Sequence, residues 1–148
     1  MPILDHLEPQ AVFSYFEQLC AIPHGSGNTK AISDFLVRFA AAHHLRCIQD
    51  AHNNVVIFSP GTPGYEAAAP VILQGHMDMV CEKRSDVVFD FERDAIRTRI
   101  DGGWVKAEGT TLGADCGIGM AAALAVLLDP AAQHGPLEAL FTVDEETG

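Results

Sequence analysis

The sequence VILQGHMD at residues 71–78 runs from apolar residues directly into polar ones. Its first three residues have the short, continuous apolar character of a buried strand, so we predict one over residues 71–73. In extended backbone, the side chains of His76 and Asp78 point to the same side. The carboxylate can therefore orient or polarise an imidazole whose other nitrogen binds a metal ion.

Helices are predicted on either side of this strand. Apolar residues at helical spacing indicate a first helix within residues 5–22, with Pro9 in its first turn. A second helix is expected to start near Asn28, a good N-cap residue, and the Ala- and Leu-rich residues 117–128 indicate a third. We expect the first two helices to pack on a sheet.

The remaining apolar segments predict strands. Residues 45–49 and 55–58 flank a turn-like segment and are expected to form an edge hairpin. A second hairpin is predicted from residues 96–100 and 104–107, which flank an Asp-Gly-Gly turn. Residues 137–143 indicate a last buried strand. Because helices alternate with apolar strands, the predicted fold class is a layered α/β domain.

Composition restricts the class of partner. The 148 residues fit one domain, and a formal charge of −11 disfavours nucleic acid and anionic membranes, which leaves small molecules or peptides. No apolar run approaches the roughly 18 residues of a membrane span and no signal-peptide pattern is present, so we expect a cytoplasmic protein. The four cysteines include no Cys-x-x-Cys pair, which argues against a zinc ribbon or a disulfide framework.

Two further polar clusters follow apolar segments or precede a helix. Asp115 is the carboxylate of a glycine-dense loop over residues 109–119, and a carboxylate has two oxygens able to bridge two cations. A glycine loop before a helix is more often a turn or an anion cradle, which is the alternative here. Phosphate binding is disfavoured, because this loop lacks the Lys-Ser/Thr ending of a phosphate-binding loop and the spacing of a dinucleotide-binding loop. For Cys116, packing is favoured over a metal contact. Glu145 and Glu146 follow the last strand, where neighbouring side chains diverge, so one can bind metal while the other handles protons.

At these residues the sequence resembles the co-catalytic zinc peptidases of the aminoacylase, carboxypeptidase and dipeptidase superfamily, and its dipeptidases above all. The resemblance covers essentially the whole chain. The stretches that carry it are residues 20–24, 74–80, 101–107, 109–119 and 134–138.

The resemblance implies a role for each site residue. His76 would bind one zinc ion, Asp115 would bridge two, and Glu146 would bind the other, with Co²⁺ or Mn²⁺ as possible substitutes. Asp78 would orient His76, and Glu145 would be the general base. The family also implies a cis peptide bond between Asp115 and Cys116, at a position where many relatives have Asn or Asp in place of the cysteine.

The implied fold is a helix–sheet–helix catalytic domain of which residues 1–148 form only the N-terminal part. A further acidic ligand, a late histidine and an inserted lid and dimerisation domain would lie beyond Gly148. The implied activity is zinc-dependent hydrolysis of dipeptides, Xaa-His in particular, by a homodimer, and we expect the chain alone to be inactive or nearly so.

Two alternatives remain open from the residues. The same metal centre could act on N-acyl amino acids. The chain could also be a non-catalytic interaction module, although retention of both Glu145 and Asp78 argues against a decayed site.

Overall fold

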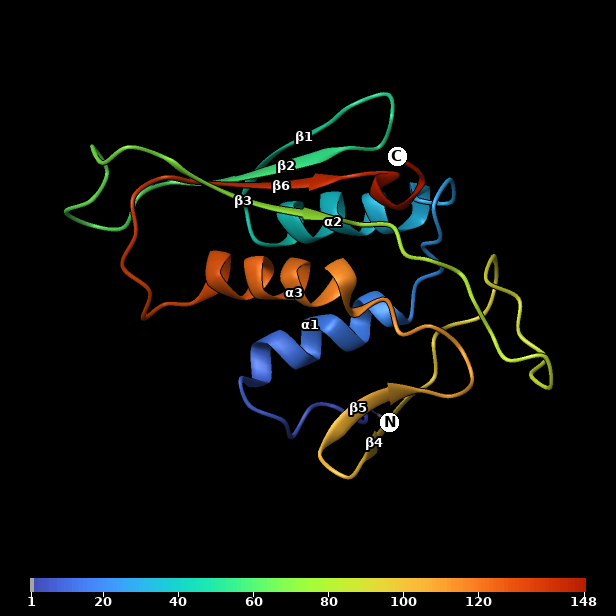
Figure 1. The fold of residues 1–148 in the computed structure, drawn as a ribbon. Helices are drawn as coiled ribbons and strands as arrows, with labels where there is room; N and C mark the ends of the chain where they lie inside the picture. The colour runs from blue at the N-terminus through green and yellow to red at the C-terminus, as the bar shows by residue number, and fades with distance from the viewer. Residues whose placement is uncertain (1) are drawn as a thin grey trace.

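A four-stranded sheet forms one layer of the molecule, with the helices on one side of it (Figure 1). The structure is a computed structural model that describes residues 2–148. The strands, in spatial order, are β1 (Arg46–Gln49), β2 (Val55–Ser59), β6 (Leu137–Thr142) and β3 (Val71–His76). The β1–β2 and β2–β6 pairs are antiparallel, whereas β3 runs parallel to β6. The predicted edge hairpin and the predicted α/β class are both confirmed.

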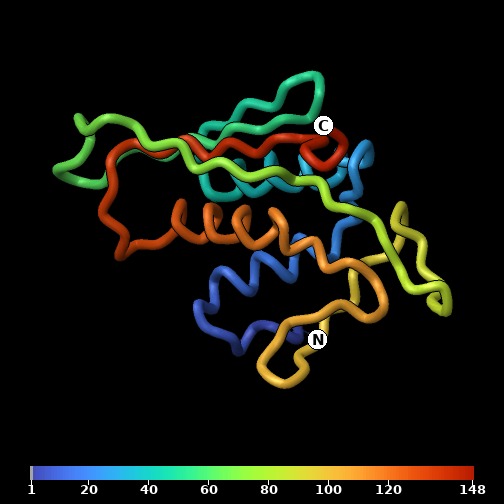
Figure 2. Tube along the Cα trace, in the orientation of Figure 1, coloured from blue at the N-terminus to red at the C-terminus, as the bar shows by residue number. Residues whose placement is uncertain are grey.

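The parallel pair determines where the polar clusters lie. His76, the last residue of β3, is in register with Thr142, the last residue of β6. Parallel strands end at the same edge of a sheet, so the residues after β3 and after β6 emerge side by side (Figure 2).

Helices cover one face of the sheet. The helices are α1 (Gln10–Cys20), α2 (Lys30–Ala42) and α3 (Ala114–Leu128). Figure 1 shows α2 and α3 beneath the same face, and α1 beyond α3. In residues 2–148 the opposite face has no helix over it, so the second helical layer of the implied helix–sheet–helix arrangement is not seen there.

The expectation that α1 packs on the sheet was wrong. It packs on α3 instead, and Phe16 lies close to Gly117, where an added Cβ would come within 3.1 Å of the Phe16 ring. The other side of α3 faces β3, where Met120 approaches Gly75. Because α3 is apolar around most of its circumference, it separates α1 from the sheet.

Burial along the strands depends on which face of the sheet the helices cover and on where each strand lies in the sheet. In β6, Leu137, Ala139 and Phe141 are buried and alternate with half-buried residues, as predicted for a core strand. The prediction for residues 71–73 was wrong in part, because the side chains of Val71 and Ile72 are 50% and 60% exposed. An apolar run indicates a strand but not its place in the sheet, and β3 lies at an edge.

Two helix starts differ from the predicted ones. Pro9 is the N-cap residue of α1 and not part of its first turn. Helix α2 begins after Thr29, because the backbone N–H of Asn28 donates to the carbonyl of Gly25 and closes a turn before the helix. The predicted cap at Asn28 was therefore wrong by one residue.

A separate two-stranded hairpin follows the loop after β3. Its strands are β4 (Thr98–Asp101) and β5 (Trp104–Ala107), which confirms the predicted Asp-Gly-Gly hairpin with a later start. Among residues 2–148, no helix has the length and apolar character needed to cross a bilayer.

Candidate metal centre

Three segments converge at the edge where β3 and β6 end. They are residues 76–78 at the end of β3, the start of α3 at Asp115, and the short 3₁₀ helix η1 (Glu145–Thr147) after β6. His76 Nε2 lies 3.0 Å from Asp115 Oδ1 and 3.9 Å from Glu145 Oε2. The ligand atoms of His76, Glu145 and Glu146 all lie within 4.8 Å of one another. The five predicted site residues are thus brought together.

The imidazole of His76 is buried and held at one nitrogen. Its Nδ1 lies 3.0 Å from the backbone carbonyl oxygen of Asp78 and 3.3 Å from the carboxylate oxygen Oδ1 of the same residue. A carbonyl oxygen only accepts, so this contact places a proton on Nδ1. Nε2 faces the Asp115 carboxylate, to which it donates when the ring is protonated. The sequence predicted the carboxylate contact but not the carbonyl.

The carboxylates around the His76 imidazole favour a positive charge on this ring. Burial by itself would lower the pKa of His76, but the hydrogen bond with Asp115 and the nearby Asp78 outweigh it and raise the pKa above its ordinary value. An arrangement that stabilises an imidazolium between carboxylates also suits a divalent cation held by the neutral ring.

Asp78 is the most completely enclosed residue of the site. Its side chain has no exposed surface and accepts hydrogen bonds from the Ser26 hydroxyl at 2.7 Å and from the backbone N–H groups of Glu145 and Glu146 at 3.1 and 3.2 Å. Burial raises the pKa of the Asp78 carboxyl, but the Ser26 and backbone hydrogen bonds more than offset it, so the pKa lies below its ordinary value. Asp78 is therefore a buried anion that joins the end of β3 to η1.

The glutamates are arranged differently from the prediction. Extended backbone was expected to separate Glu145 from Glu146, but Asp144 adopts a left-handed conformation with φ 55° and turns the chain into η1. Both carboxylates consequently approach His76. Both are also exposed, as is Asp115, whose side chain is 87% accessible.

The peptide bond between Asp115 and Cys116 is cis, as the resemblance implied. The Cys116 sulfur packs close to Gly75 and Gly119, where an added Cβ would lie 3.3 and 2.8 Å from it. The same sulfur is within 4.8 Å of the ligand atoms of His76 and Asp115. Cys116 therefore combines the predicted packing role with a position beside the cluster.

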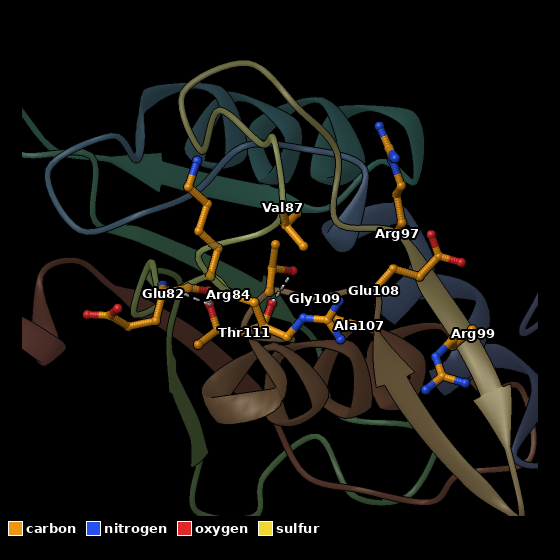
Figure 3. Close-up of a pocket in the computed structure, with 11 residues that line it drawn as sticks. Glu82, Arg84, Val87, Arg97, Arg99, Ala107, Glu108, Gly109 and Thr111 are labelled. Atoms are coloured by element: carbon orange, nitrogen blue, oxygen red, sulfur yellow. Dashed lines mark hydrogen bonds between the residues drawn. The ribbon is translucent and has the colours of Figure 1, made fainter.

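A cavity of about 800 Å³ lies elsewhere, between the loop after β3 and the β4–β5 hairpin (Figure 3). Figure 3 shows Arg97 pointing away from Arg84 and Arg99, and the guanidinium of Arg84 is already paired with Asp86. Beside the cluster lies a smaller cavity of about 270 Å³, whose lining includes the apolar residues Val80, Leu112 and Ala114 and the acidic residues Asp115 and Glu146. The smaller cavity is the one that adjoins the candidate ligands.

A histidine and several carboxylates at the carboxyl ends of parallel strands define an α/β protein with a candidate metal site. The chain belongs to Peptidase family M20/M25/M40, whose sequence profile matches residues 72–148. The family expected from the sequence motifs is thereby confirmed.

Two close relatives align with essentially the whole chain. It is 47% identical over 148 residues to the cytosol non-specific dipeptidase of Escherichia coli strain K12, and this match covers 100% of the chain and 30% of that protein. The crystal structure of aminoacylhistidine dipeptidase from Vibrio alginolyticus superposes with a TM-score of 0.95 at 45% identity, covering 98% of this chain and 30% of that one. The chain thus spans about 30% of the length of these relatives.

A more distant structure has the same fold. It is a Bacillus subtilis protein, a dinuclear metal binding peptidase from the M20 family, with a TM-score of 0.50 and 13% identity. The match covers 91% of this chain and 35% of that one.

Proposed function

We propose that the protein containing this chain hydrolyses dipeptides, Xaa-His dipeptides in particular, at a centre that binds two zinc ions. The observation that carries the proposal is the convergence of His76, Asp115, Glu145 and Glu146 in a chain 47% identical to a dipeptidase. The name of the Vibrio relative supports the Xaa-His preference, and the description of the Bacillus relative supports two metal ions.

The donor set fits zinc. One imidazole nitrogen and several carboxylate oxygens are ligands that catalytic zinc sites use. The contact at Nδ1 leaves Nε2 of His76, which faces Asp115, as the nitrogen that would bind the metal. In this proposal His76 and Glu146 would each hold one ion, and Asp115 would be a ligand shared by the two. Bound zinc supplies Lewis acidity toward the scissile carbonyl and lowers the pKa of the attacking water.

Glu145 is the proposed general base. Its backbone N–H is fixed by Asp78, while its side chain is 59% exposed and able to reach a water molecule. A carboxylate held at the backbone and free at the side chain can take a proton from water and deliver it to the leaving amine. Asp78 acts through His76 by fixing the orientation of the ring.

The chain holds three of the five protein ligands that the family resemblance implies. We propose that residues 1–148 are the N-terminal part of the catalytic domain and that the remaining ligands and the lid and dimerisation domain lie beyond Gly148. With two ligands missing, the chain alone would bind zinc weakly and turn over little substrate. The name of the Escherichia coli relative supports a cytosolic location.

The test is hydrolysis of β-alanyl-histidine and glycyl-histidine by the full-length protein, with zinc and after chelation. We expect zinc-dependent cleavage, and we expect Glu145→Gln to lower kcat by about 100- to 10,000-fold because the base is lost. Glu92→Gln is the matched control, since it removes the same charge from an exposed glutamate outside the site.

Two outcomes would contradict the proposal. Cleavage of N-acyl amino acids in place of dipeptides would assign the centre to the other substrate class. Bound zinc without hydrolysis of either substrate would favour the non-catalytic module.

A further inference from the structure

A loop between α1 and α2 touches all three segments of the candidate metal centre. This loop, residues 24–27, is called the clamp loop below. It runs beside the chain that follows β3, where Gly25 pairs with Met79 as an isolated parallel bridge. The backbone N–H of Met79 donates to the carbonyl of His24 at 3.1 Å, and the clamp loop therefore continues the sheet edge beyond the last residue of β3.

Two hydrogen bonds connect the clamp loop to residues beside the proposed ligands. The Ser26 hydroxyl donates to Asp78 Oδ2 at 2.7 Å, and the backbone N–H of Gly27 donates to Asp144 Oδ1 at 2.7 Å. Asp78 is two residues after His76, and Asp144 immediately precedes Glu145. Figure 2 shows this segment, in blue, passing beside the red C-terminal curl.

The clamp loop also packs against the loop that carries Asp115. His24 is 4% exposed, and an added Cβ at Gly113 would lie 3.3 Å from its Nε2. Burial is the main cause that lowers the pKa of His24, so this ring is a neutral packing group. The conformation of the clamp loop is itself constrained, because an added Cβ at Gly25 would lie 2.5 Å from the Cys81 sulfur.

We infer that the clamp loop is a positioning element of the metal centre, and that Ser26 in this loop and its neighbour Asp144 at the start of η1 are positioning residues. Ser26 holds the Asp78 carboxylate, which contacts the His76 ring and accepts from the backbone of Glu145 and Glu146. Gly27 holds Asp144 in the left-handed turn that starts η1. The inference rests on the proposed function, since it assumes that His76 and Glu146 bind zinc.

The contacts of Ser26 favour a role at the metal centre over a role limited to folding. Ser26 is half-buried, and its hydroxyl bonds to a carboxylate that has two backbone donors of its own. Removing the hydroxyl leaves Asp78 with fewer restraints but does not open a cavity in the core. The effect should therefore appear in zinc binding and in the order of η1.

The first experiment compares Ser26→Ala with Ser26→Thr in the full-length protein, using competition with a chromophoric chelator to measure zinc affinity. We expect Ser26→Ala to weaken zinc binding by about 10- to 100-fold, the usual effect of losing a residue that supports a ligand. Ser26→Thr keeps the hydroxyl and should restore the affinity. Peptide hydrolysis should show a lower kcat for Ser26→Ala with little change in KM, because Ser26 acts through Asp78.

The second experiment measures amide hydrogen exchange at Glu145 and Glu146 in the metal-free full-length protein. Asp144→Gly keeps the left-handed turn but removes the acceptor of the Gly27 N–H, whereas Asp144→Asn keeps both. We expect faster exchange in Asp144→Gly and Ser26→Ala, and wild-type exchange in Asp144→Asn and Ser26→Thr.

The outcomes separate this inference from the proposed function. Wild-type zinc affinity and exchange in Ser26→Ala, in a protein that cleaves dipeptides, would overturn the positioning role and leave the function intact. Weaker zinc binding and faster exchange in Ser26→Ala, in a protein that binds zinc but cleaves no peptide, would support the positioning role and reject the proposed function. No zinc binding by the wild type would overturn both.

Discussion

The candidate site has a buried half and an open half. His76 and Asp78 are enclosed and hydrogen-bonded, whereas Asp115, Glu145 and Glu146 present exposed carboxylates to the same point. Among the ion pairs of residues 2–148, none joins these three carboxylates to a lysine or arginine. In the proposed centre, the protein would thus fix the orientation of the His76 ligand in advance and leave several negative charges for a bound cation to neutralise.

The largest effect is expected when residues 1–148, which contain both halves, are tested for catalysis by themselves. We expect the 148-residue chain to show no dipeptide hydrolysis above background under conditions in which the full-length protein is active, because two implied ligands are missing. A direct comparison of the two at equal concentration and saturating zinc checks this. Equal turnover would mean that residues 1–148 already contain the whole centre.

The open half should make stability depend on zinc. In the full-length protein, zinc at about 100 times its dissociation constant should raise the free energy of unfolding by about 2.7 kcal/mol, because the folded state alone binds it. Denaturant unfolding with and without zinc measures the change. Asp115→Asn should remove most of the zinc effect, and an unchanged zinc effect in that variant would exclude Asp115 as a ligand.

The buried half should matter to folding without any metal. Asp78→Asn would place an amide N–H₂ group against donors that now bond to a carboxylate, at an expected cost of about 2 kcal/mol in the free energy of unfolding. Asp115→Asn is the matched variant from the open half and should cost less than about 0.5 kcal/mol in metal-free protein, since its side chain is exposed. Similar costs for the two variants would contradict the division into halves.

Much of the fold was predictable from local patterns. The hairpins, the core strand β6 and the helix over residues 117–128 follow from apolar periodicity and turn residues, and the structure has all of them. The place of β3 at a sheet edge was not predictable, because edge and central positions are decided by pairing with β6, far along the chain. The same holds for α1, which packs on α3 and not on the sheet.

Some residues of the candidate site could likewise be predicted from the sequence, and others could not. His76, Asp78, Asp115, Glu145 and Glu146 could be selected from the sequence because chemistry-bearing residue types follow apolar segments. Ser26 and Gly27 could not, since their partners Asp78 and Asp144 lie 52 and 117 residues away. The position of η1 was also missed, because it depends on the left-handed conformation of Asp144.

Anomalous diffraction at the zinc absorption edge would show whether His76, Asp115 and Glu146 bind metal. Crystals of the full-length protein should be grown with zinc. We expect two anomalous peaks in this cluster, one bonded to His76 Nε2, one to Glu146, and both to Asp115. Anomalous peaks only at other positions, in crystals of protein that hydrolyses dipeptides, would contradict this expectation.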